Sequence, residues 1–323
     1  MSTKTNRREF MRATGLAATG MAAGVPAAAE PQAQSSPART MGARFRELLR
    51  RGQPFENIGA YDATSAQLAE AVGFPSIILG RSAVADYYGR PGWNLITLSE
   101  YLDFTGTVAR SVNIPTIVDI EMESRQSTLD VLGLYSYVKE IERAGIAGIH
   151  FGDGMDVMGQ RKGLLTTSQM IDKIHAAADA RSDLVLMVRC NGFMVEGIDR
   201  TLERATAYVQ AGAESIYFSP GMPWENLPRA AGAIKAPLAA NMAYNIPMSK
   251  VREAGVTVAT YLTILQSYSQ MAVYEGLMEL KTTGLTMKSS RGQNLGPRLP
   301  AEVRAKMGQV AQYTALGKKY NVQ

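Results

Sequence analysis

Charged and polar residues that could form an active site lie at the ends of short apolar runs. Two of them are acidic and close together in the sequence. Asp119 and Glu121 are two residues apart in the run TIVDIE. On a β-strand such residues point to the same side. Two carboxylates together are costly unless they share a cation, and oxygen ligands suit Mg²⁺ or Mn²⁺. We therefore predict a divalent metal on Asp119 and Glu121. The alternative is that Glu121 already lies in a solvated loop.

Basic and polar residues at the ends of other runs could hold and process an anionic substrate. Arg189 follows the apolar run LVLMV, so a buried guanidinium there needs an anion, either a substrate carboxylate or one of the two acids. A purely structural salt bridge is the alternative. His150 shares a strand face with position 152, which allows a general acid or base near neutral pH or a core histidine. The predicted catalytic residues are Arg189, His150 and Asp153, and the predicted substrate-binding residues are Tyr61, Gly80, Arg81, Ser82 and Asn241.

Eight alternating strand and helix patterns position these residues. The strand candidates are residues 57–62, 76–80, 116–121, 146–153, 184–192, 215–221, 237–242 and 256–261. Apolar runs spaced by amphipathic helices indicate parallel strands, and eight units favour a closed α/β barrel, the (β/α)₈ TIM barrel. An open doubly wound sheet is less well supported, because the first turn, YDATSA, has no Gly-rich phosphate turn. In this barrel, chemistry sits at the carboxyl ends of the strands.

The barrel is expected to have additional helices at both of its ends. An opening helix precedes Gly52, so the barrel with this helix is expected over residues 41–285. Residues 286–323 form a C-terminal extension with one further helix, AEVRAKMGQVAQYTALGKKY.

Composition limits the function classes. The 323 residues are 46% hydrophobic and include a single cysteine, Cys190, so no intrachain disulfide and no cysteine-based zinc cage can form. The formal net charge is +5, of which residues 1–29 contribute +3. The remaining charge is too small for nucleic-acid binding. We predict no nucleic-acid partner.

The first 29 residues read as an export signal. Arg7 and Arg8 are followed by Phe10, then by the weakly apolar run LAATGMAAGVPAAA, which ends in the small-residue pattern of a cleavage site. The run is too short for a stable membrane anchor. We predict twin-arginine export to the periplasm, with residues 30–40 as a linker. A disordered basic N-terminus is the alternative.

The order of these motifs resembles a known superfamily. GAYDATSAQLAEAVGF, SIILGRSAVA, IPTIVDIE, AGIHFGD, RCNGF, ERATAYVQAGAESIYF and APLAANM are similar, in that order, to segments of the isocitrate lyase/phosphoenolpyruvate mutase superfamily over about residues 41–285. The resemblance implies a barrel with Mg²⁺ that makes or breaks C–C or C–P bonds beside a 2-oxo or 2-hydroxy acid, through an enolate. It also implies a homo-oligomer, a dimer or tetramer.

The resemblance also implies roles for single residues. Asp119 matches the metal ligand, Arg189 the substrate-binding arginine, and Asn241 a strand-seven asparagine. Gly80 to Ser82 occupy a loop whose backbone N–H groups hold a carboxylate, with Arg81 where a glycine is usual. Glu121 replaces the usual second aspartate.

Other positions depart from the superfamily pattern. Acids are replaced at Gly92, Gly152, Asn191 and Ser219. The catalytic loop with cysteine and histidine is replaced by GMDVMGQRKGLLTT, so Cys190 on the fifth strand is expected to be packing.

Three functions remain open on the sequence. The first is a metal-dependent lyase or hydrolase that cleaves a small 2-oxo or 2-hydroxy carboxylate. The second is a non-catalytic carboxylate-binding protein on the same barrel, which the replaced acids favour. The third is an aldolase of a related barrel class. Fold alone does not separate them.

Overall fold

The computed structural model describes residues 40–120, 131–157, 160–218, 222–243, 245–292, 299–308 and 310–320. Its contacts divide the chain into Met1–Ala38 and Arg39–Gln323, and all described residues belong to the second unit. The predicted signal, most of the linker, Glu121 and Ser219 lie outside the described residues.

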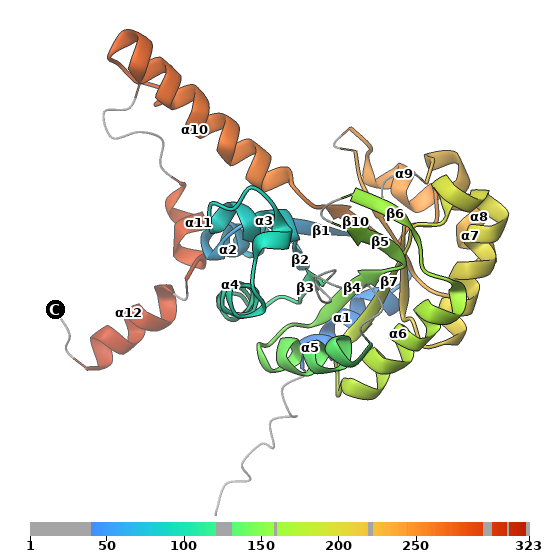
Figure 1. Ribbon diagram of the computed structural model, residues 1–323. Helices are drawn as coiled ribbons and strands as arrows, with labels where there is room; N and C mark the ends of the chain where they lie inside the picture. Colours follow the sequence, from blue (N-terminus) through green and yellow to red (C-terminus); the bar gives the residue numbers. More distant parts are fainter. Residues whose placement is uncertain are drawn as a thin grey trace, which may run out of the picture. The chain divides into compact units, whose positions relative to one another are not determined.

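Eight parallel strands close into a barrel, as the sequence predicts (Figure 1). Around the barrel the order is β1, β10, β9, β8, β7, β4, β3, β2. The barrel strands are β1 (Phe55–Ala60), β2 (Ser76–Leu79), β3 (Thr116–Asp119), β4 (Gly148–Gly152), β7 (Val185–Cys190), β8 (Ser215–Phe218), β9 (Leu238–Asn241) and β10 (Val258–Tyr261). Almost every residue in them is buried, which is why their sequences read as continuous apolar runs.

Helices follow the strands and cover the outside of the barrel, except for the last of them, which is exposed over most of its length and extends away from the barrel (Figure 1). They are α2 (Ala63–Val72), α3 (Arg81–Tyr87), α4 (Leu98–Arg110), α5 (Val131–Arg143), α6 (Thr167–Ala180), α7 (Phe193–Gln210), α8 (Leu227–Ala233), α9 (Met248–Glu253) and α10 (Ile264–Thr283), with 3-10 turns at Trp93–Leu95 and Trp224–Asn226. Asp62, Thr97 and Thr166 each open a helix with a capping box, in which the N-cap side chain and the third helical residue satisfy each other's backbone donors.

The interior of the barrel is closed at the amino ends of the strands by α1 (Met41–Arg50). Phe45, Leu48 and Leu49 of this helix pack against Phe55 and Val258, which begin β1 and β10. The opposite end, where the strands terminate, is the end that carries the polar residues. One close approach there requires glycine, because a Cβ on Gly59 would lie 1.7 Å from the Leu262 carbonyl oxygen.

Two segments differ from the sequence-based expectation. Between β4 and α6 the chain forms an antiparallel hairpin of β5 (Gly154–Val157) and β6 (Gln160–Leu164). The single C-terminal helix is divided into α11 (Ala301–Lys306) and α12 (Val310–Lys319), because Gly308 adopts φ +59° between them. Helix α11 lies against α2.

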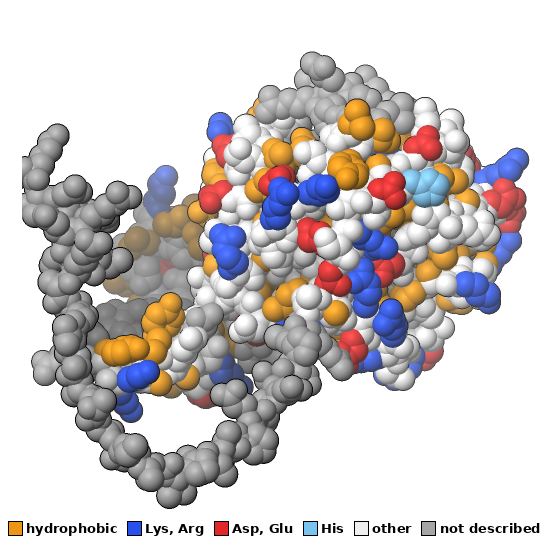
Figure 2. Space-filling model, turned by 90° about the horizontal axis from the view of Figure 1, so that it is seen from below, with side chains coloured by type: hydrophobic (Ala, Val, Ile, Leu, Met, Phe, Trp, Pro, Cys, Tyr) orange, Lys and Arg blue, Asp and Glu red, His pale blue; other side chains and the backbone are white. Residues whose placement is uncertain are grey.

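The described residues contain no helix with both the length and the apolarity to cross a bilayer. On the face shown in Figure 2, lysine and arginine side chains alternate with aspartate and glutamate, without a continuous basic area.

Candidate active site at the carboxyl ends of the strands

A buried carboxylate lies at the end of β3 and faces three nitrogen-bearing side chains. Asp119 is 4% exposed. Its Oδ2 atom lies 3.2 Å from Arg81 Nε, 3.8 Å from His150 Nε2 and 3.9 Å from Arg189 Nη1. These residues come from β3, the start of α3, β4 and β7. Strand alternation allowed His150 to face the interior of the barrel, and the structure brings Asp119, His150 and Arg189 together there.

The charges in this group keep Asp119 ionised. Burial alone would raise the pKa of its carboxyl, but the positive charge of Arg81 and the nearby His150 and Arg189 outweigh it and lower the pKa to about 2. Burial lowers the pKa of the Arg189 guanidinium, an effect that Asp119 opposes, and an arginine stays protonated at neutral pH.

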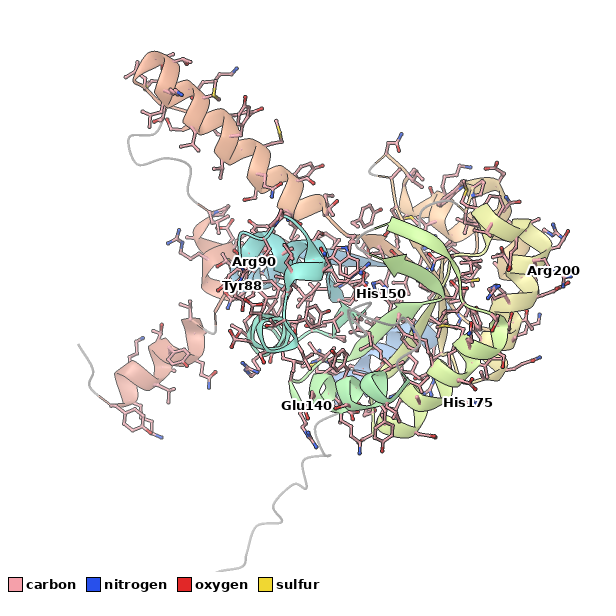
Figure 3. The ribbon with its side chains drawn as sticks, viewed as in Figure 1. Tyr88, Arg90, Glu140, His150, His175 and Arg200 are labelled. Atoms are coloured by element: carbon pink, nitrogen blue, oxygen red, sulfur yellow. The ribbon has the colours of Figure 1, made fainter. Side chains whose placement is uncertain are left out.

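His150 is a neutral imidazole inside the barrel. Burial lowers its pKa, and the attraction of Asp119 opposes that shift. Neither ring nitrogen has a hydrogen-bond partner among the described residues. Figure 3 shows His150 within the barrel and His175 outside on α6. A buried, neutral histidine with two unused nitrogens can accept or donate a proton to a bound ligand.

Two aromatic residues complete the site: Tyr217, which the sequence reasoning missed, and Trp93, for which the sequence left open a pocket wall or loop packing. Tyr217 pairs in register with Arg189, its ring lies 5.0 Å from the His150 ring, and its hydroxyl donates to Asn241 Oδ1. Burial raises the pKa of Tyr217, so the hydroxyl stays protonated. The inward alternation of SIYF was a signal that could have identified it. Trp93 lies with its ring 3.8 Å from the Arg81 guanidinium carbon.

Asp153, predicted as catalytic, is placed elsewhere. It follows β4 by one residue, so it points away from the barrel axis toward α7. Its Oδ1 accepts from the Asn191 backbone and side chain at 2.8 and 3.0 Å, and its Oδ2 accepts from the Tyr208 hydroxyl at 2.8 Å. Arg204 Nε lies 3.7 Å from Oδ2. Both oxygens are therefore engaged in a buried network, and we assign Asp153 a structural role.

The predicted substrate-binding residues lie in different positions around the mouth of the barrel. Asn241 ends β9 and contacts Tyr217, as described above. Gly80 precedes α3 as its N-cap, Arg81 contacts Asp119, and Ser82 is exposed. Tyr61 is half-buried after β1, where its backbone N–H donates to Ser65 Oγ.

The described part of the Asp119 surroundings does not fit a divalent ion. Mg²⁺ takes six oxygen ligands at about 2.0–2.1 Å. One of the two carboxylate oxygens of Asp119, Oδ2, already faces two guanidinium groups within 4 Å. Glu121, the second predicted ligand, lies outside the described residues, as does Ser219. Within the described ranges no group of three or more histidine, cysteine or acidic side chains could hold a metal.

Three of the four positions at which acids are predicted to be replaced lie within the described residues, as does the cysteine. Gly92 precedes the 3-10 turn that contains Trp93, Gly152 ends β4, and Asn191 follows β7. Lys173 Nζ donates to the Gly152 carbonyl at 3.2 Å. Cys190 is 3% exposed, and burial raises the pKa of its thiol.

Comparison with known proteins gives one consistent family. Residues 45–281 match the family model described as phosphoenolpyruvate phosphomutase. A 2-methylisocitrate lyase of Aeropyrum pernix is 33% identical over 236 residues, which are 70% of this chain and 75% of that protein. A 2,3-dimethylmalate lyase of Eubacterium barkeri is 27% identical over 74% of this chain and 84% of that protein.

Solved structures share the fold. Phosphonopyruvate hydrolase, solved with oxalate and Mg²⁺, superimposes with a TM-score of 0.75 at 21% identity, over 87% of this chain and 99% of that chain. Oxaloacetate acetylhydrolase, solved with 3,3-difluorooxalacetate, gives a TM-score of 0.74 at 22% identity, over 88% of this chain and 98% of that chain.

Proposed function

Because the chain belongs to the phosphoenolpyruvate phosphomutase/isocitrate lyase superfamily, we propose that it is a lyase that cleaves a C–C bond of a small 2-oxo or 2-hydroxy carboxylate through an enolate. The observation that carries this proposal is the meeting of Asp119, His150 and Arg189 at the carboxyl ends of three strands. Relatives named as 2-methylisocitrate lyase and 2,3-dimethylmalate lyase support a carboxylate substrate. Cleavage of a C–P bond is the second candidate reaction, because a phosphonopyruvate hydrolase is among the structures similar to this chain.

The residues have separate roles in this reaction. Arg189 binds a substrate carboxylate as a charge-assisted, planar donor. Cleavage of the C–C bond leaves its electron pair on the carbon beside the carbonyl, as an enolate whose oxygen needs positive charge. When the substrate is a 2-hydroxy acid, a neutral His150 accepts the hydroxyl proton that is lost as the bond breaks, and the same proton can return to the enolate carbon. Tyr217 supports Asn241 at the edge of the site.

Magnesium was expected from the sequence, and a structure similar to this chain contains it. Because the described residues around Asp119 do not fit that ion, none of these roles depends on it. A bound magnesium would act as a Lewis acid toward the enolate oxygen.

A substrate screen tests the proposal. The purified protein would be incubated with 2-methylisocitrate, 2,3-dimethylmalate, oxaloacetate and phosphonopyruvate, and the 2-oxo acid and second product would be measured with and without added Mg²⁺. We expect turnover of at least one acid, reduced at least 100-fold by Arg189→Lys, since lysine lacks the planar fork. Arg200→Lys, at an exposed position on α7, is the matched control and should retain full activity. Stabilisation by an acid without any product would favour the carboxylate-binding protein instead.

Two further properties are proposed with this function. Export through the twin-arginine pathway to the periplasm is supported by Arg7, Arg8 and the apolar run that follows them. Assembly into a homo-oligomer is supported by α10, which exposes several large apolar side chains, including Tyr274 and Leu277 at about 60% exposure.

A further inference from the structure

Arg81 lies beside Asp119, one of the two residues that the sequence predicts as metal ligands. Its Nε lies 3.2 Å from Asp119 Oδ2, and the two side chains are 10% and 6% exposed. The guanidinium lies over the Trp93 ring, with the central carbon 3.8 Å from the ring centroid. The ion pair with Asp119 and the contact with the aromatic ring together hold this cation in one position.

Electrostatic repulsion disfavours the binding of a metal ion at Asp119 Oδ2. Arg81 and Arg189 both approach Asp119 Oδ2, at 3.2 and 3.9 Å, so a cation on that oxygen would lie close to two guanidinium groups. A divalent ion on that oxygen would add two more positive charges within a few ångströms of both guanidinium groups. In a buried site such repulsion is weakly screened. Binding of the ion would therefore require Arg81 to leave Asp119 and the Trp93 ring.

The guanidinium has the properties that an enolate or carboxylate oxygen requires. It is permanently charged, planar, and can donate two parallel hydrogen bonds to one anion. Asp119 contacts the group through Nε. The sequence shows why the contact is possible: Arg81 follows Gly80 directly at the end of β2, where the superfamily pattern has a small residue.

We propose that the Arg81 guanidinium takes the place of a divalent cation beside Asp119 and binds the oxyanion of the ligand, so that anion binding at this site needs no metal. The identity of the anion as a small carboxylate rests on the proposed function. The displacement of the metal rests on the contacts of Arg81 alone.

Manganese binding tests the first half of this proposal. Mn²⁺ would be titrated into the wild type, Arg81→Ala, Arg81→Lys and Arg90→Ala, with bound ion measured from the loss of the free-ion electron paramagnetic resonance signal. Arg90 is a matched control, since it is an exposed arginine of the same segment that pairs with Glu100. We expect Mn²⁺ to bind Arg81→Ala at least tenfold more tightly than the other three proteins. Equal binding by wild type and Arg81→Ala, or binding by neither, would overturn the proposal.

Oxalate, a planar dianion similar in shape to an enolate of a 2-oxo acid, tests the second half. Calorimetric titration in excess chelator should show binding to the wild type and to Arg90→Ala, and binding at least tenfold weaker to Arg81→Ala. Added Mn²⁺ should restore the affinity of Arg81→Ala. Oxalate binding by the wild type only in the presence of metal would refute the role of Arg81. If both binding results hold but no acid is cleaved, the proposed function fails and this inference stands.

Discussion

The Tyr208 hydroxyl on α7 donates a 2.8 Å hydrogen bond to Oδ2 of Asp153, the residue that follows β4. Both side chains are buried, and Arg204 also contacts the Tyr208 oxygen at 2.9 Å. This bond ties the outer helix layer to the barrel at the point where the strand enters the β5–β6 hairpin.

Tyr208→Phe should therefore destabilise the fold. The change leaves a buried carboxylate with one donor fewer, which costs about 1.5–3 kcal/mol of unfolding free energy for a hydrogen bond to a charged group. Chemical denaturation measured by circular dichroism checks the value. Tyr313→Phe, on the exposed side of α12, is the control and should change the free energy by less than about 0.5 kcal/mol. Equal effects of the two variants would contradict the structural role given to Asp153.

The pH dependence of stability should report the state of His150. Its pKa is lowered in the folded protein, so below about pH 6.5 the unfolded chain binds more protons than the folded chain. The stability present above that pH is therefore lost as the pH falls from 7 toward 5. The contribution of Asp119, with a pKa lowered to about 2, is lost only between about pH 4 and pH 2.

The chain has only two histidines, His150 and His175, so replacing each in turn shows which one causes the change of stability between pH 7 and pH 5. Unfolding free energies at pH 7, 6 and 5 should show a smaller slope in His150→Asn than in the wild type. His175→Asn, at an exposed position on α6, should keep the wild-type slope. A wild-type slope in His150→Asn would show that the buried imidazole is not the group that titrates.

The sequence predicted the barrel and part of the site for a common physical reason. Parallel strands are buried on both faces, so each is a clear apolar run, and a charged residue such as Arg189 or Asp119 at its end stands out. Because successive side chains of a strand point to opposite faces, the side chains that face the barrel interior can then be identified. The same rule places the Asp153 side chain outside the barrel, since Asp153 directly follows Gly152, which faces inward.

Contacts between side chains from different units could not be predicted in this way. Arg81 and Asp119 are 38 positions apart, and their pairing depends on the side-by-side arrangement of β2 and β3. Asp62 is another acid at a strand end, but its carboxylate caps α2 by accepting from the Ser65 backbone N–H. Capping and catalysis use the same residue types at the same place in a βα unit, so composition does not separate them.

Export should depend on the arginine pair at the start of the chain. Replacing Arg7 and Arg8 together with lysine keeps the charge but removes the pair that the export receptor reads, so the precursor should remain uncleaved in the cytoplasm. Cell fractionation and immunoblotting measure this. Arg12→Lys is the control and should be exported as the wild type is. Cleaved double variant in the periplasm would exclude the twin-arginine assignment.

Assembly through α10 is the last prediction. The helix exposes apolar residues around much of its circumference, and a helix of that kind is normally buried. The exposed set includes Tyr268, Met271, Val273, Tyr274, Leu277, Met278 and Leu280. Burying one leucine side chain of this kind contributes about 1.5–3 kcal/mol, so several together stabilise an interface.

A charge on that face should disrupt the interface. Leu277→Glu places a carboxylate in the contact, and light scattering coupled to size-exclusion chromatography should show a shift from dimer or tetramer toward the 34.9 kDa monomer. Leu132→Glu makes the same substitution at a residue of α5 that is 81% exposed, and it should leave the mass of the wild-type assembly unchanged. A monomeric wild type would contradict this prediction. Loss of the oligomer in Leu132→Glu but not in Leu277→Glu would also contradict it, because the interface would then not include the apolar surface of α10. Because the Leu277 side chain is 61% exposed in this chain, the variant should also keep its secondary structure, which circular dichroism would verify.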